Sequence, residues 1–182
     1  MIGVNGRIPW NIPEDTSYFR DVTRGKVVIT GRVSFEETSD QSHLSHARWT
    51  VLISRTSHDR LTENVGSKIK LCRSFDEAID IAYDLAIADG RNGSEDIDCW
   101  IVGGEHVFEE AFRHPSIHEL RLTRINANID KHQQGAAAKF PATYRWDYRF
   151  KEINQWEGTE SGTTIPCDLR YSFHVYQCFR PR

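Results

Sequence analysis

A carboxylic acid and an indole ring near the N-terminus have the chemistry to handle a proton on a flat, apolar ligand. Asp15 lies at the start of an amphipathic segment that Pro13 opens, and Trp10 lies just before that segment. One interpretation is an ordinary helix start, where acids favour the positive end of the helix dipole. A lone acid at the mouth of an apolar groove, beside a large aromatic wall, also suits a buried site for a planar heterocycle. The glycine-containing loop 3–12 would supply mobility beside that site.

Two glycine turns are the next candidates for chemistry. Gly31 follows the apolar run 26–30 and opens a helix start that carries Arg32 and Ser34. Backbone amides at such a helix start form a natural phosphate site, to which an arginine can add a charge-assisted contact. The pair Gly103-Gly104 follows a second apolar run and would let a ligand approach the backbone closely. This second turn does not have the spacing of a Rossmann fingerprint.

The elements that must position these residues alternate between strands and helices. Buried strands are predicted at residues 26–30, 49–54, 68–72 and 99–102. Ser74 and Glu77 make a capping box for a helix whose apolar residues recur from Phe75 to Ala86, and a second helix follows Gly104. Strands at 120–125, 149–157 and 172–179 favour an antiparallel finish, and segments 89–98 and 133–139 are predicted to be surface loops. This order predicts a mostly parallel α/β sheet with an antiparallel end.

Composition sets modest limits on class. The 182 residues suit one domain with a sizeable core, and a net charge of −3 leaves no electrostatic footprint for nucleic acid. No apolar stretch is long enough to span a membrane and no signal-peptide pattern is present, so we expect a cytoplasmic protein. Metal-ligand spacing is absent among the 8 histidines and the 4 cysteines, so no metal is expected. Buried free thiols are favoured over disulfides for Cys72, Cys99, Cys167 and Cys178.

The motifs together resemble the dihydrofolate reductase family. Residues 2–19 are similar to its active-site loop and first helix, and Gly-Arg-x-Ser-Phe-Glu at 31–36 and the Gly103-Gly104 turn are similar to its cofactor segments. The likeness runs from residue 2 to about residue 179. It implies a dihydrofolate reductase-like three-layer α/β fold in a single domain over 1–182. That fold has a mostly parallel central sheet, helices on both faces and an antiparallel C-terminal strand.

The resemblance implies the reduction of 7,8-dihydrofolate to 5,6,7,8-tetrahydrofolate with NADPH, in support of one-carbon metabolism and nucleotide synthesis. It implies that Asp15 promotes protonation of the pterin and that Trp10 walls the pocket. It also implies that antifolates bind and that the chain is a monomer unless fused to thymidylate synthase. By position in the family motifs, the substrate-binding residues would be Phe19, Arg48, Thr123 and Val102, with Thr123 bonded to the pocket carboxylate.

For the cofactor, the resemblance implies a cis Gly103-Gly104 bond beside the nicotinamide and a pyrophosphate at the following helix start. Phe108 stands where many relatives have tyrosine. Two arginines and two hydroxyls would meet where adjacent parallel strands end, which suits the 2′-phosphate of NADPH. Solvated arginines at strand ends are the other interpretation of that cluster. The predicted cofactor-binding residues are Gly31, Arg32, Val33, Ser34, Ser54, Arg55, Arg73, Gly103, Gly104, Glu105, His106, Val107 and Phe108.

The chain departs from the family at its start. Relatives have an apolar central strand before the Ile-Gly loop, whereas here Met1 directly precedes Ile2. We therefore expect an in-frame apolar strand to be encoded upstream. Two alternatives stay open: a pyrimidine reductase of riboflavin synthesis with the same fold, and a truncated, non-catalytic remnant that acts only as a binding or interaction module. The joint presence of Trp10, Asp15, Phe19 and Arg48 argues against the first, and the missing strand is the support for the second.

Overall fold

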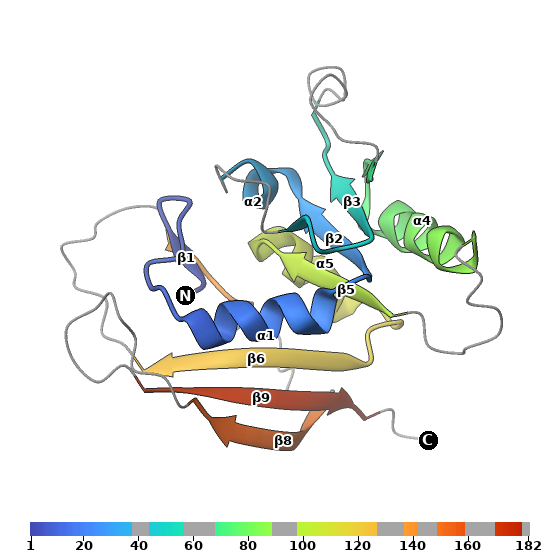
Figure 1. Cartoon of the computed structure of the whole chain (residues 1–182). Helices are drawn as coiled ribbons and strands as arrows, with labels where there is room; N and C mark the ends of the chain where they lie inside the picture. The colour runs from blue at the N-terminus through green and yellow to red at the C-terminus, as the bar shows by residue number, and fades with distance from the viewer. Residues whose placement is uncertain are drawn as a thin grey trace. The chain divides into compact units, whose positions relative to one another are not determined.

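Four parallel strands form the sheet that the apolar runs predict. In the computed structural model they are β2 (Val27–Gly31), β3 (Trp49–Ile53), β4 (Ile69–Cys72) and β5 (Cys99–Gly103). Their order in the sheet is β4-β3-β2-β5, and each neighbouring pair is parallel (Figure 1). The two central strands are the most apolar and the most deeply buried, as expected of strands covered on both faces.

Three helices accompany this sheet: α2 (Arg32–Glu37), α4 (Phe75–Ala88) and α5 (Glu105–Arg113). In α4 the buried residues are Phe75, Ala78, Ala82 and Ala86, at the predicted helical spacing. The hydroxyl of Ser74 accepts the amide of Glu77 at 3.2 Å. The Glu77 carboxylate accepts the amide of Arg73 at 2.8 Å. The predicted cap is therefore present, with its return bond going to the residue before Ser74.

The longer C-terminal strands form a separate antiparallel sheet. It consists of β6 (Glu119–Asn126), β8 (Phe150–Glu157) and β9 (Arg170–Cys178), in the order β6-β9-β8. The helix α1 (Pro13–Thr23) begins at the proline that the sequence indicated. Ile12, just before α1, packs with Tyr171 and Phe173 of β9 in one buried cluster, so the start of this helix lies on one face of the antiparallel sheet.

The loop at the N-terminus contains a tight turn. Val4 and Arg7 exchange two backbone hydrogen bonds, of 2.9 and 3.0 Å, around Asn5 and Gly6. Both turn residues have positive φ (49° and 71°), which is the requirement of a type I′ hairpin turn and explains the Asn-Gly pair.

The prediction of a surface loop at 133–139 is wrong at residues 137–138. There β7 (Ala137–Ala138) pairs antiparallel with β1 (Gly3–Val4). This pair could not be predicted from the sequence, because strands of two residues are too short to show the alternation of apolar and polar residues that is typical of a strand.

The structure describes residues 1–37, 44–56, 68–88, 98–126, 137–141, 149–158 and 170–179. Residues 133–136 of the predicted loop 133–139, most of the predicted loop 89–98, and Cys167 lie outside these ranges. The chain divides into two compact units, Arg20–Ala111 and the combined segments Met1–Phe19 and Phe112–Arg182, each of which is described on its own. The thiols of Cys72, Cys99 and Cys178 are free. Cys72 is fully buried and the other two are half-buried.

Candidate functional site

Asp15 lies in the first turn of α1, where its carboxyl is largely withdrawn from water. Thr123 on β6 donates its hydroxyl to Asp15 Oδ1 at 2.6 Å. Burial raises the pKa of the Asp15 carboxyl above its ordinary range, and the hydrogen bond from Thr123 partly offsets that rise. A half-buried acid whose pKa is raised by burial is a candidate for proton transfer.

Aromatic side chains surround the base of this turn. Trp10 and Tyr18 pack against the buried cluster of Ile12, Tyr171 and Phe173. Tyr18 also meets Phe173 edge-on, with ring centroids 4.9 Å apart. Trp10 and Tyr18, which flank Asp15 in the sequence, therefore belong to one apolar, aromatic cluster. Phe19, farther along α1, is half-buried.

The predicted cofactor residues of the other unit gather at one edge of the parallel sheet. Each of the four strands ends with one of the predicted groups: Arg73 after β4, Ser54 and Arg55 after β3, Gly31 and Arg32 at the end of β2, and Gly103 and Gly104 at the end of β5. Because all four strands are parallel, their carboxyl ends lie at the same edge. That edge is where open α/β sheets bind their ligands.

The two glycine turns touch each other at this edge. The hydroxyl of Thr30 donates to the carbonyl of Gly103 at 3.1 Å. A Cβ on Gly104 would collide with the Ser34 hydroxyl, and one on Gly31 would lie 3.0 Å from Val107 of α5. The peptide bond between Gly103 and Gly104 is cis, as the resemblance implies. Glycine at these positions lets two backbone turns, each followed by a helix, come together.

The strand ends of β3 and β4 also meet as predicted. Ile53 is in register with Cys72, and the amide of Ser54 donates to the carbonyl of Cys72 at 2.9 Å. Arg55 and Arg73 follow as exposed residues on these neighbouring ends. The buried Ser54 hydroxyl donates to the Thr56 carbonyl at 3.0 Å, which orders the turn beside Arg55. Two exposed cations at adjacent strand ends are suited to a dianionic phosphate.

The other predicted residues of this unit are placed as follows. Arg32 pairs with Glu36 one helical turn on. His106 is exposed and lies 3.6 Å from Glu109, whereas Val107 is buried. The Phe108 ring lies close beneath Gly103. The remaining predicted residues are an exposed Val33, an exposed Arg48 just before β3, a half-buried Val102 on β5 and a half-buried Glu105 at the start of α5.

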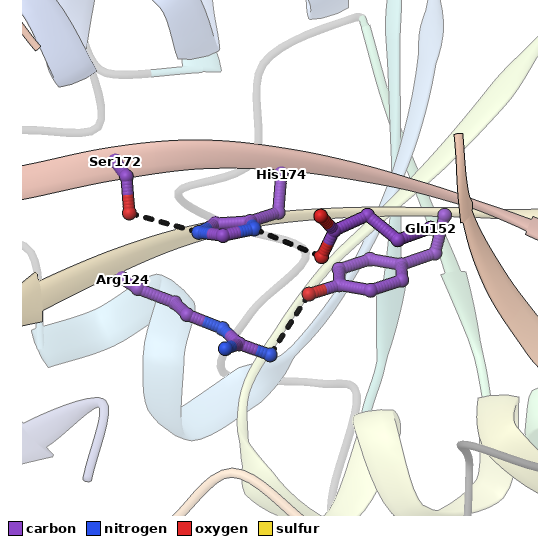
Figure 2. Close-up of polar contacts among 5 residues, drawn as sticks. Arg124, Glu152, Ser172 and His174 are labelled. Carbon is purple, nitrogen blue, oxygen red and sulfur yellow. Dashed lines mark hydrogen bonds and ion pairs between the residues drawn. The ribbon is translucent and has the colours of Figure 1, made fainter. Parts of the chain in front are cut away.

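A second polar cluster, formed by Ser172, His174 and Glu152, lies on the face of the antiparallel sheet opposite to Thr123 (Figure 2). Ser172 Oγ lies 2.8 Å from Nε2 of His174, and Glu152 Oε2 lies 3.1 Å from its Nδ1. Hydrogen bonds from Tyr176 and His174 lower the pKa of Glu152.

The order serine, histidine, acid in this cluster matches that of a hydrolase triad. Ser172, however, pairs with Arg124 on one side and Glu157 on the other. The amides beside it therefore serve the two ladders and not an oxyanion hole. We interpret the cluster as a structural one, in which Ser172 and Glu152 supply hydrogen-bond partners for the two ring nitrogens of the buried His174.

One contact at the Asp15 turn was not predicted. The hydroxyl of Tyr171 on β9 donates to Glu14 Oε2 at 2.7 Å. No local pattern links these residues, because they are 157 positions apart. Among the described ranges, no group of three or more histidine, cysteine or acidic residues could hold a metal ion. In the same ranges no helix is long and apolar enough to cross a membrane.

Comparison with known proteins places these features in a family. The family model described as dihydrofolate reductase matches residues 1–177. The dihydrofolate reductase of Heliothis virescens is 25% identical over 184 residues, which cover 97% of this chain and 90% of that protein. The Drosophila melanogaster enzyme of the same name is 28% identical over 136 residues, which cover 71% of this chain and 69% of that protein.

Longer relatives and a solved structure extend the comparison. The bifunctional dihydrofolate reductase-thymidylate synthase 2 of Arabidopsis thaliana is 30% identical over 138 residues, which cover 71% of this chain but only 23% of that protein. Among solved structures, dihydrofolate reductase from Enterococcus faecalis, complexed with NADP(H) and RAB-propyl, superposes with a TM-score of 0.69 at 19% identity. The match covers 98% of this chain and 89% of that one, so the two share a fold.

Proposed function

Because the chain belongs to the dihydrofolate reductase family, we propose that it reduces 7,8-dihydrofolate to 5,6,7,8-tetrahydrofolate with NADPH. The observation that carries this function is the Asp15 carboxyl, which is half-buried, raised in pKa and hydrogen-bonded to Thr123. A carboxyl in this state can accept hydrogen bonds from the amidine-like edge of a pterin. It can also promote protonation of N5 through a water molecule.

The residues at the parallel sheet's edge fit a nicotinamide dinucleotide. NADPH, when bound, supplies the hydride. The Gly31 and Gly103-Gly104 turns bring backbone and two helix starts together, which suits a pyrophosphate. Arg55 and Arg73 would bind the 2′-phosphate that separates NADPH from NADH. We propose that the other residues predicted from the family motifs to bind the cofactor also contact NADPH.

On the substrate side, each assignment is made by position in the family motifs. Trp10 would form an aromatic wall of the pterin pocket, and its packing on the Ile12 cluster supports that role. Phe19 would contact the aminobenzoyl ring, Val102 would line the pocket, and the exposed Arg48 would bind the glutamate α-carboxylate. The loop 3–12 would exclude water from the nicotinamide, and its Asn5-Gly6 hairpin gives it an ordered tip.

The wider assignments follow from the same activity. We propose that residues 1–182 act as one dihydrofolate reductase domain in the cytoplasm, binding antifolates as well as substrate. The bifunctional relatives carry thymidylate synthase in their names, and the chain spans about a quarter of the Arabidopsis protein. A monomer is proposed for the chain as a free-standing enzyme.

The test is to follow NADPH absorbance as the purified chain is mixed with dihydrofolate. Oxidation of NADPH in proportion to the tetrahydrofolate formed, and a much slower reaction with NADH, are expected. The riboflavin-pathway alternative predicts turnover of a ribosylaminopyrimidine instead. A non-catalytic remnant would turn over neither substrate. Either result would refute the proposal.

A further inference from the structure

Helix α1 is held to the antiparallel sheet at two successive residues of its first turn. Thr123 on β6 donates to Asp15 at 2.6 Å, and Tyr171 on β9 donates to Glu14 at 2.7 Å. In the register of these strands Thr123 is paired with Phe173 and Ile125 with Tyr171. The two donors therefore come from adjacent strands, two register positions apart, and stand on the same face of the sheet.

Two such bonds constrain the helix more than either alone. Successive side chains of an α-helix point about 100° apart around its axis. Ile12 and Tyr18 already pack this part of the chain against the sheet, and the bond from Thr123 fixes Asp15 at one point. A second bond, from a different strand to the preceding residue, further restricts rotation of the turn. The Glu14 bond thereby contributes to the direction in which the Asp15 carboxyl points.

Tyr171 is itself held in place by its surroundings. Its side chain is buried, and its ring meets Phe173 edge-on at 5.8 Å between centroids. Its carbonyl accepts the amide of Gly158 at 2.9 Å. A Cβ on Gly158 would overlap the Tyr171 ring, so glycine here lets the backbone after β8 close over that ring. A side chain fixed on several sides is a rigid anchor for the group to which it donates.

We propose that Tyr171, through Glu14, is a positioning residue for Asp15. The inference rests on the reductase activity proposed above. Tyr171 touches no reacting group in this argument; it acts by keeping the first turn of α1 in the orientation at which the Asp15 carboxyl meets the pterin. Catalytic groups need placement within a fraction of an ångström, and a misplacement of about 1 Å can cost roughly a hundredfold in rate.

The test compares two tyrosine-to-phenylalanine variants on the same strand. Tyr171→Phe removes the hydroxyl that holds Glu14. The control, Tyr176→Phe, removes a hydroxyl from the opposite face of β9, where it accepts a hydrogen bond from Arg124 at 2.8 Å and donates one to Glu152. Both tyrosines are 3% exposed, and because Tyr176 has two such partners, the structural cost of the control should be at least as large as that of Tyr171→Phe.

The readouts are kcat, KM for dihydrofolate, KM for NADPH, the pH profile of the rate and Tm. Tyr171→Phe should lower kcat/KM for dihydrofolate about tenfold, which is less than the roughly hundredfold loss that a misplacement of about 1 Å can cause. It should also move the pH profile, because the environment of Asp15 changes, while KM for NADPH stays within about twofold. Tyr176→Phe should lower Tm by at least as much as Tyr171→Phe and leave the other values as in the wild type.

Substitutions at Glu14 supply a second route to the same answer if Tyr171→Phe does not fold. Glu14→Gln keeps an acceptor for the tyrosine hydroxyl and should retain most of the activity. Glu14→Ala should behave like Tyr171→Phe in kcat/KM and pH profile, and the double variant should lose little more in these two values, because both changes remove the same Tyr171–Glu14 bond.

A wild-type chain that reduces dihydrofolate, with Tyr171→Phe matching it in kcat/KM and pH profile, would show that Tyr171 has a structural role only and overturn the inference. Glu14→Ala with wild-type kinetics would do the same. A wild-type chain without activity would overturn the proposed function and this inference together.

Discussion

Replacing Asp15 with asparagine removes an ionisable group from the site while keeping its shape. The amide oxygen of the new side chain can still accept the Thr123 hydroxyl that now lies 2.6 Å from Oδ1. The fold around α1 should therefore be retained. Positioned acid–base groups contribute about a hundredfold to ten-thousandfold in rate, so D15N should lower the rate of hydride transfer by about that range at neutral pH.

The loss should depend on pH in a defined direction. At low pH dihydrofolate arrives already protonated, so the need for Asp15 decreases and the gap between wild type and D15N should narrow. The assay is single-turnover NADPH oxidation across a pH series. Asp21→Asn, an exposed aspartate on the same helix paired with Arg24, is the matched control and should leave the rate unchanged. A D15N rate close to wild type at neutral pH would remove Asp15 from the mechanism.

Stability gives an independent check on the same residue. Burial raises the pKa of Asp15 above its ordinary value of 3.8, so the native state binds this proton more tightly than the unfolded state. The unfolding free energy should then fall as pH rises from that ordinary value through the raised one. D15N has no such group. Its Tm relative to wild type should therefore rise with pH over this window, and a Tm difference independent of pH would contradict the burial of the carboxyl.

Three further changes test the other parts of the structure. Arg55→Ala with Arg73→Ala should reduce the preference for NADPH over NADH by a hundredfold or more, at about 1.5–3 kcal/mol per charge-assisted contact; equal losses for both cofactors would refute the 2′-phosphate assignment. Gly104→Ala should lower Tm because its Cβ collides with the Ser34 hydroxyl, and adding Ser34→Ala should recover part of that loss. Phe173→Ala, at a side chain 1% exposed, should lower the free energy of unfolding, measured in urea, by about 3–5 kcal/mol. The control, Phe179→Ala at an exposed side chain, should lower the free energy of unfolding by no more than about 0.5 kcal/mol.

The local elements follow closely from sequence patterns. The helix at Phe75–Ala88 buries Phe75, Ala78, Ala82 and Ala86 at helical spacing and has its cap at Ser74, as predicted, because both signals act within a turn or two of chain. The parallel strands are recognised from their short apolar runs bounded by glycine and polar residues. The meeting of Ser54 with the end of β4 follows from the adjacency of two consecutive parallel strands.

The pairing of distant segments could not be predicted in this way. The Asp15–Thr123 hydrogen bond was anticipated only through resemblance to a family, since 108 positions separate the two residues. The strand pair β1–β7 was missed altogether, although the Asn5-Gly6 turn beside it carried a recognisable hairpin signal.

By itself, the sequence determined where the longer helices and strands form, because hydrophobic periodicity, caps and turn residues act over a few positions. Only the tertiary structure decided which of them meet. The contact of Ser34 with Gly104 depends on β2 and β5 being neighbours in the sheet. The hold of Tyr171 on Glu14 depends on β9 lying between β6 and β8, beneath the start of α1. Strand order is set by packing of the whole chain, so no window of sequence contains it.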